Sequence, residues 1–325
     1  MIHIKQRKNN EIKVVDLFCG AGIGAMGLKL CGFNIIYGVD NNKYAVETYN
    51  NNIGNHAICE SIRNIEASSI PDHDVMVATP VCKSFSVAGN GKGVKDKKNG
   101  DLSYHFFRLL KEKLPKVFLF ENVSGMVSKK HRCFFDNFIN DLESIGYNVS
   151  WKLVNCADYG IPQDRKRVFV IGVRKDINKK FTFPQEVDAD KKTCLRDAIF
   201  DIKNIKNIKN NEYFEGGYSP RYKSRNRQRQ WDQQSFTIVS EARQLPLYPE
   251  PPNYDIRKME EYEVDPPRRF TVRECLRIQT APDEFYFGNN VPLLKQYERC
   301  SGIPTLMAYK LGIEIEKVLL SKINT

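Results

Sequence analysis

Four residues whose side chains could perform chemistry stand next to short apolar runs of this chain. Cys82 follows the run 75–78 and Pro80, Glu121 follows the run 117–120, and Arg165 and Arg167 precede the run 168–171. A short apolar run closed by proline is typical of a buried strand that opens into a loop. Because α/β enzymes hold their reactive groups at the carboxyl ends of strands, we expect Cys82 to be a nucleophile. The carboxyl group and the two guanidinium groups could meet it there.

A glycine turn near the N-terminus predicts a cofactor site. The turn has the form Gly-x-Gly-x-Gly at 20–24, between an apolar run over 14–18 and a predicted helix over 25–31. Asp40 ends the next predicted strand, 34–40, where its carboxylate could accept ribose hydroxyls. The close glycine spacing favours S-adenosylmethionine (AdoMet), with Asp16 for its cationic end and Phe18 for its adenine. A nicotinamide-dependent oxidoreductase is the alternative for the glycine turn alone.

The elements that position these residues change in kind along the chain. Helix and strand candidates alternate up to about residue 175, which predicts an α/β fold with a mostly parallel sheet and helices on both faces. Residues 176 to about 290 hold most of the prolines and lose this alternation. We expect a Rossmann-like catalytic domain over 1–182, completed by a C-terminal helical region over 296–325. A smaller irregular domain should occupy 183–295.

Composition limits the partners and the setting. Lys and Arg outnumber Asp and Glu by 50 to 39, a formal charge of +11 that favours a polyanionic partner, although a lysine-rich proteome would have the same effect. Nine cysteines without a Cys-x-x-Cys pair argue against a disulfide framework and a zinc site. No apolar run approaches the roughly 20 residues of a membrane span. We expect a soluble cytoplasmic protein without metal or membrane contact.

Basic residues alternate over 221–229, where Arg or Lys stands at every second position. In an extended strand these side chains would line one face. Such a face suits phosphates, and bidentate arginines suit the O6 and N7 edge of guanine. A solvated basic edge strand is the alternative.

Taken in order, these segments resemble the motif series of the DNA cytosine-C5 methyltransferases. Asp16 to Gly22 is similar to the AdoMet loop of that family, and the Cys82 segment to its catalytic Pro-Cys loop. The motifs Glu-Asn-Val at 121–123 and Gln-x-Arg-x-Arg at 163–167 follow, and residues 269–279 are similar to Leu-Thr-x-Arg-Glu-x-x-Arg-x-Gln. The resemblance covers nearly the whole chain.

The resemblance implies methyl transfer from AdoMet to C5 of a cytosine that is flipped out of double-stranded DNA. Cys82 would add to C6, Glu121 would meet N3, Arg167 would meet O2, and Arg165 would support the loop. A lid over 83–100 would close on the base. The implied cofactor contacts are Asp16, Phe18, Gly20, Gly22, Ile23, Asp40, Asn41, Ser61, Ile62, Pro80, Leu102 and Ser301. We expect a monomer.

The irregular region resembles the recognition domain of bacterial enzymes that methylate GGCC. The similar segments are 224–231, 235–238 and 243–244, and Thr237 resembles a threonine that helps to position this domain. The implied nucleic-acid contacts are Lys83, Ser84, Ser86, Arg225, Arg227, Arg229, Thr237 and Arg243. A restriction-modification or phage-protection role would follow.

Four positions depart from the family pattern. Val81 replaces the proline before the cysteine, Lys83 replaces a glutamine, Ser61 replaces an aspartate, and the segment 300–304 lacks the usual asparagine. These departures suggest a modified AdoMet as an alternative donor, with Lys83 beside an extra negative group. A tRNA cytosine methyltransferase and a catalytically weak, sequence-specific DNA-binding relative are further alternatives.

Overall fold

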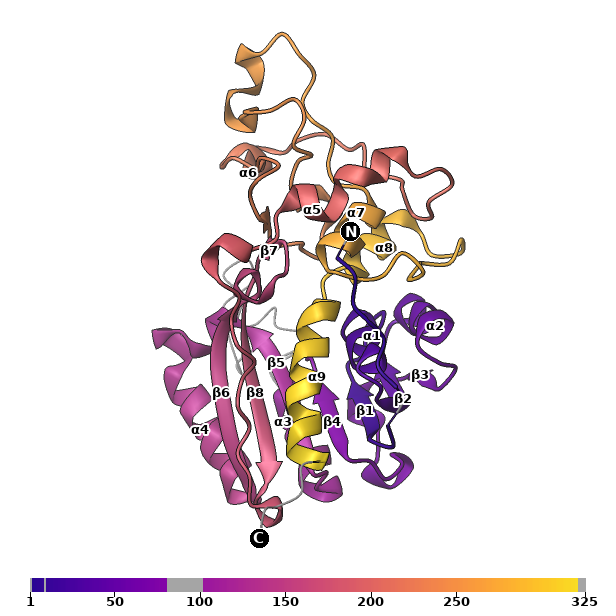
Figure 1. The fold of residues 1–325 in the computed structure, drawn as a ribbon, viewed down its shortest axis with the longest axis vertical. Helices are drawn as coiled ribbons and strands as arrows, with labels where there is room; N and C mark the ends of the chain where they lie inside the picture. The colour runs from indigo at the N-terminus through magenta and orange to yellow at the C-terminus, as the bar shows by residue number, and fades with distance from the viewer. Residues whose placement is uncertain (1, 9, 81–101, 321–325) are drawn as a thin grey trace. The chain divides into compact units, whose positions relative to one another are not determined.

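The computed structural model describes residues 2–8, 10–80 and 102–320 (Figure 1). The chain forms two compact units. The first, here called the sheet unit, comprises residues 6–154, 166–185 and 308–325. The second, here called the irregular unit, comprises residues 1–5, 155–165 and 186–307.

A seven-stranded sheet in the order β3-β2-β1-β4-β5-β8-β6 organises the sheet unit. The pairs among β1 to β5 are parallel, whereas β8 runs antiparallel to β5. The strands are β1 (Lys13–Leu17), β2 (Asn34–Asp40), β3 (Ala57–Cys59), β4 (Val75–Ala78), β5 (Val117–Val123), β6 (Tyr147–Asn155) and β8 (Lys166–Arg174). The predicted α/β fold is confirmed, with β8 as an antiparallel addition to a mostly parallel sheet.

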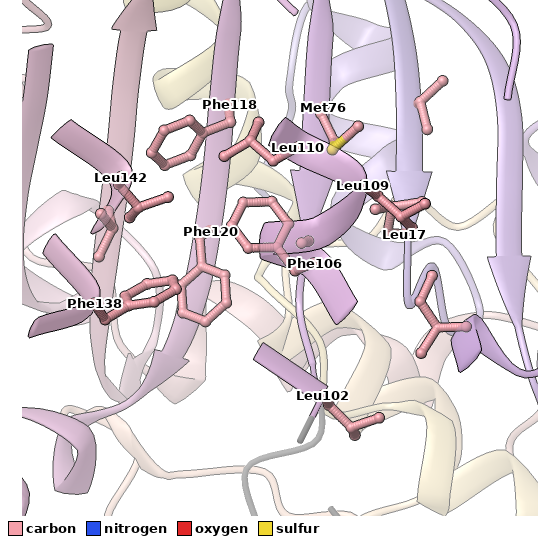
Figure 2. Close-up of a cluster of buried hydrophobic side chains, with 14 of the residues drawn as sticks. Leu17, Met76, Leu102, Phe106, Leu109, Leu110, Phe118, Phe120, Phe138 and Leu142 are labelled. Carbon is pink, nitrogen blue, oxygen red and sulfur yellow. The ribbon is translucent and has the colours of Figure 1, made fainter. Parts of the chain in front are cut away.

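Helices cover both faces of this sheet. On one face, Phe106 and Leu110 of α3 (Leu102–Lys113) and Phe138 of α4 (Arg132–Ser144) pack on Phe118 and Phe120 of β5 (Figure 2). Figure 1 shows α9 (Thr305–Leu320) across the other face. There α9 packs on α1 (Ile23–Leu30), and α2 (Lys43–Asn52) follows β2.

The irregular unit contains little regular structure. A short parallel pair joins β7 (Gln163–Asp164) to β9 (Ser235–Phe236). Its helices are α5 (Leu195–Ile199), α6 (Pro220–Lys223), α7 (Val272–Ile278) and α8 (Leu293–Arg299). Thr271 and Glu274 form a capping box at the start of α7, which satisfies backbone N–H groups that the helix itself leaves unpaired.

The prediction of an extended strand over 221–229 is wrong. The helix α6 occupies Pro220–Lys223, with Ser219 as its N-cap and Pro220 in the first turn. Tyr222 is fully buried and its hydroxyl group donates to the carbonyl oxygen of Leu245. Capping and the burial of this ring therefore outweigh the alternating pattern, and the arginines do not line one face of a strand.

Candidate active site

Glu121 and Arg167 form a buried ion pair at the end of β5. Glu121 is 8% exposed, and its Oε1 lies 3.1 Å from Nε of Arg167. The antiparallel register pairs Glu121 with Phe169 and Val123 with Arg167. Residues 121 and 167 are therefore diagonal neighbours on one face of the sheet, within reach of each other for long side chains. The structure thus brings together two of the residues that the sequence singled out.

The strand beside β5 leads towards the candidate nucleophile. Ala78, the last residue of β4, pairs with Phe120, which directly precedes Glu121. Thr79 donates from Oγ1 to the carbonyl oxygen of Phe18 at 3.0 Å, and Pro80 is buried. The described part of β4 therefore ends next to the strand that carries Glu121. Cys82 and the other residues expected in this loop, Lys83, Ser84, Ser86 and the lid 83–100, lie outside the described residues.

Arg165 forms several hydrogen bonds within the irregular unit. It is 2% exposed, and its NH1 donates to the carbonyl oxygen of Ile238 at 3.3 Å. Its backbone N–H donates to Oδ1 of Asn155, and its carbonyl oxygen accepts from the N–H of Cys156. These bonds fix Arg165 within the irregular unit. The predicted support of the Cys82 loop by Arg165 stays a prediction, because that loop lies outside the described residues.

The glycine turn has the backbone that its sequence predicts. Gly20 and Gly22 have positive φ angles of 53° and 89°, and Gly22 is the N-cap of α1 without a side-chain cap. The N–H of Gly20 donates to Oδ2 of Asp40 at 3.1 Å. A Cβ added to Gly20 would meet no atom within 4 Å, so the turn is open at this residue, whereas a Cβ added to Gly22 would lie 2.8 Å from Ile53. An uncapped helix start beside open space at Gly20 leaves backbone N–H groups that a ligand could approach.

Asp16 is the unusual carboxyl group beside this turn. It is 5% exposed at the carboxyl-terminal half of β1. Burial, and after it the negative charge of Asp40, raises the pKa of Asp16 to about 8. A cationic ligand placed next to this carboxyl group would favour its ionised form.

The remaining cofactor candidates differ in their environments. Phe18 has a positive φ of 60° and packs partly buried on the core beneath α3. Ser61 caps the short 3-10 helix η1 (Ile62–Asn64). Ile23, Ile62 and Leu102 are buried, whereas Asn41 is exposed. Ser301 is partly exposed and belongs to the irregular unit.

The nucleic-acid-binding candidates of the irregular unit fall into two groups, those whose side chains bind other side chains of the unit and those that are exposed. Arg227 donates to Oε1 of Gln244 at 3.0 Å, and burial, followed by repulsion from Arg225, lowers its pKa. Arg229 lies 4.1 Å from the centre of the Phe236 ring and 3.3 Å from the Asp164 carboxylate.

Arg225 and Arg243 are exposed, the latter on the 3-10 helix η10 (Ala242–Gln244). Oγ1 of Thr237 donates to the carbonyl oxygen of Asp164 at 2.6 Å, which holds the residue after β9 next to β7.

Sequence reasoning missed the positioning role of two buried glutamines. Nε2 of Gln163 donates to Oε1 of Gln279 at 2.8 Å, while its own Oε1 accepts from the N–H of Ile238. Gln279 in turn donates to the carbonyl oxygen of Cys300. These amides join four segments of the irregular unit, around residues 163, 238, 279 and 300. Both glutamines belong to sequence motifs, at 163–167 and 269–279, so their positions alone could have indicated a structural role.

Two kinds of site are absent from the described residues. No group of three or more His, Cys, Asp or Glu side chains in ranges 2–8, 10–80 and 102–320 could hold a metal ion. Within the same ranges, no helix combines the length and apolar character needed to cross a membrane.

Comparison with known proteins gives a consistent result. The model of the C-5 cytosine-specific DNA methylase family matches residues 12–317. The chain is 38% identical to the Type II methyltransferase M.MthTI of Methanothermobacter thermautotrophicus over 97% of this chain and 100% of that protein. It is 37% identical to M.FnuDI of Fusobacterium nucleatum over 96% of each. The S. pombe Dnmt2 methyltransferase has the same fold, with a TM-score of 0.70 and 18% identity over 96% of this chain and 100% of that one.

Proposed function

The chain belongs to the C-5 cytosine-specific DNA methylase family, which transfers a methyl group from AdoMet to C5 of cytosine in DNA, and we propose that Cys82, Glu121 and Arg167 perform this transfer. The observation that carries these assignments is the buried Glu121–Arg167 pair, with 3.1 Å between the charged atoms. Its carboxyl group belongs to β5, the strand next to β4, from which the chain continues to Cys82.

Cytosine C5 is a weak nucleophile and needs activation. The thiolate of Cys82 adds to C6, forming a C–S bond and moving negative charge towards N3 and O2 of the base. Glu121 supplies a hydrogen bond or proton at N3, and Arg167 stabilises the charge at O2. After the activated C5 has bonded to the methyl group, a base, which we propose to be water, removes the C5 proton, and elimination breaks the C–S bond to release Cys82.

AdoMet, when bound, supplies the methyl carbon that the activated C5 attacks. The turn offers open space at Gly20, two residues before the uncapped N-terminus of α1 at Gly22, where a ligand can approach the backbone. Asp40 is placed for ribose hydroxyls and Asp16 for the cationic end. Phe18, Ile23, Asn41, Ser61, Ile62, Pro80, Leu102 and Ser301 complete the proposed cofactor contacts.

The irregular unit is proposed to read the target sequence. Arg227, Arg229 and Arg243 are the base-reading candidates, and Arg225 and Thr237 belong to the same surface. We infer a short target of the GGCC type, supported by the similarity of 224–231 to enzymes of that specificity. We propose two domains. The catalytic domain comprises residues 1–182 and 296–325, and the recognition domain comprises residues 183–295. The two compact units support a boundary near residue 185, although residues 1–5, 155–165 and 296–307 join the irregular unit.

The biological setting is inferred from the relatives. M.MthTI and M.FnuDI are Type II methyltransferases, which supports a restriction-modification role in the cytoplasm of a bacterium or of a phage-infected cell. We propose that the enzyme acts as a monomer on double-stranded DNA.

Bisulfite sequencing of DNA methylated by the purified enzyme tests this function. Wild-type protein with ordinary AdoMet should yield 5-methylcytosine at one position of a short sequence, whereas Cys82→Ser should yield none. Cys133→Ser, which changes an exposed thiol of α4, is the matched control and should behave as wild type. Methylation of tRNA but not of plasmid DNA, or product only with a modified donor, would contradict the proposal.

A further inference from the structure

The irregular unit buries a guanidinium group that forms no ion pair with any described residue. Arg269 is 2% exposed, and it donates to the carbonyl oxygens of Gly216 and Gly217 at 2.5 and 3.0 Å. Its neighbour Arg268, by contrast, forms two bonds of 2.7 Å with the carboxylate of Glu274. A buried charge without a counter-charge is costly, and an apolar side chain often stabilises such a position equally well. The two carbonyl bonds of Arg269 satisfy donors but provide no counter-charge.

Three aromatic rings surround this guanidinium group. Its carbon atom lies 5.3 Å from the ring centre of Phe214, 4.4 Å from that of Tyr218 and 4.9 Å from that of Tyr222. The loop is shaped to allow this, since a Cβ added to Gly216 would lie 2.1 Å from the Phe214 ring. Cation–π contacts and two carbonyl bonds thus fix the segment 214–222 around Arg269.

One of these rings also contacts Arg227. The Arg227 guanidinium carbon lies 4.8 Å from the Tyr222 ring centre, and its Nε donates to the carbonyl oxygen of Tyr222 at 3.3 Å. Tyr222 is immobilised by its hydroxyl bond to Leu245, and Gln244 holds the other end of Arg227. The ring of Tyr222 therefore connects a buried guanidinium group to one of the base-reading candidates.

We propose that Arg269 is a positioning residue for sequence recognition, which acts through Tyr222 to hold Arg227 in the orientation that reads a base pair. This inference rests on the proposed reading role of Arg227. Bidentate recognition of guanine needs the guanidinium plane to be fixed before contact, because both donors must meet the base edge together. Loss of Arg269 should therefore lower sequence discrimination while the chemistry at Cys82 continues.

The test compares two values of kcat/KM. One is measured on an unmethylated duplex with the target sequence, and the other on duplexes in which one base pair of that sequence is replaced. Arg227→Ala should reduce the ratio about tenfold to a hundredfold at the position that Arg227 reads. Arg269→Met and Tyr222→Leu should each reduce it by a similar factor at the same position. The double variant Arg269→Met/Tyr222→Leu should be no worse than either single variant, because both interrupt the same connection. Arg269→Lys, which keeps the charge, should restore part of the ratio.

Arg196→Met is the matched control, since Arg196 also packs on an aromatic ring, Phe200, in the same unit. It should keep the ratio within twofold of wild type. Thermal unfolding and burst titration of active enzyme identify variants that are only less stable. Unchanged discrimination in folded Arg269→Met, with discrimination lost in Arg227→Ala, would overturn this inference alone. Unchanged discrimination in Arg227→Ala would overturn its reading role and this inference with it.

Discussion

At the scale of single residues, the pair of Glu121 and Arg167 has a consequence for catalysis. Its two side chains are largely buried, so each depends on the other for charge compensation in the free protein. In the proposed mechanism, a bound cytosine replaces part of that interaction with contacts of Glu121 to N3 and of Arg167 to O2. The pair therefore holds both side chains in place before the base arrives, which reduces the reorganisation needed during reaction.

Replacing the carboxyl group of this pair should chiefly slow the chemical step. Glu121→Gln keeps the shape but removes the acid, so we expect kcat to fall roughly 10²- to 10⁴-fold. Single-turnover methylation measures this rate, and a DNA-binding assay should show near-normal affinity. Asp136→Asn breaks an exposed ion pair with Arg132 in the same unit and should leave kcat within twofold. A kcat equally insensitive to Glu121→Gln would contradict the assigned role.

Asp16 predicts a dependence of stability on pH. Because its pKa rises from 3.8 to about 8 on folding, the folded state keeps a proton that the unfolded chain releases in this range. Its contribution to stability is therefore highest at low pH and falls as pH rises from about 4 to about 8. Without AdoMet, the melting temperature of wild type should fall more steeply across this range than that of Asp16→Asn. Parallel curves for the two proteins would refute the assignment.

At the scale of elements, the two glycines of the turn before α1 should differ in their roles, Gly22 in folding and Gly20 in cofactor binding. Gly22→Ala would place its Cβ 2.8 Å from Ile53 and so push α1 from α2, whereas the Cβ of Gly20→Ala would enter open space. Both have positive φ, so each costs about 1 kcal/mol in backbone conformation. We expect Gly20→Ala to stay folded but to bind AdoMet at least tenfold more weakly, and Gly22→Ala to lose more stability. Calorimetric titration and thermal unfolding measure these effects, and normal AdoMet affinity in Gly20→Ala would exclude the proposed site.

Apolar runs bounded by turns were enough to predict the strands that became β1, β2, β4 and β5, since each is buried on both faces. The antiparallel position of β8 could not be predicted, because it depends on pairing with β5 from a distance of about fifty residues along the chain. The strand expected over 221–229 was wrong because contacts distant in sequence decide the structure there as well. Its pattern is local, whereas the burial of Tyr222 depends on Arg269 and Leu245. The meeting of Cys82 with Glu121 and Arg167 stays a prediction.

At the scale of the whole molecule, the formal charge of +11 should make DNA binding depend strongly on salt. If about six phosphates are neutralised, affinity for a non-target duplex should fall roughly 10³-fold between about 50 and 200 mM salt. Fluorescence anisotropy with labelled duplex measures this slope. A loss of less than tenfold would mean that the excess charge is not directed to the DNA backbone.

The central claim is a transient bond between the sulfur of Cys82 and C6 of cytosine. A duplex with 5-fluorocytosine at the methylated position traps this bond, because fluorine replaces the proton whose loss releases the enzyme. Peptide mapping by mass spectrometry after incubation with AdoMet should find the methylated base attached to Cys82, and no adduct with Cys82→Ser. An adduct on another cysteine, or efficient methylation by Cys82→Ser, would contradict the account.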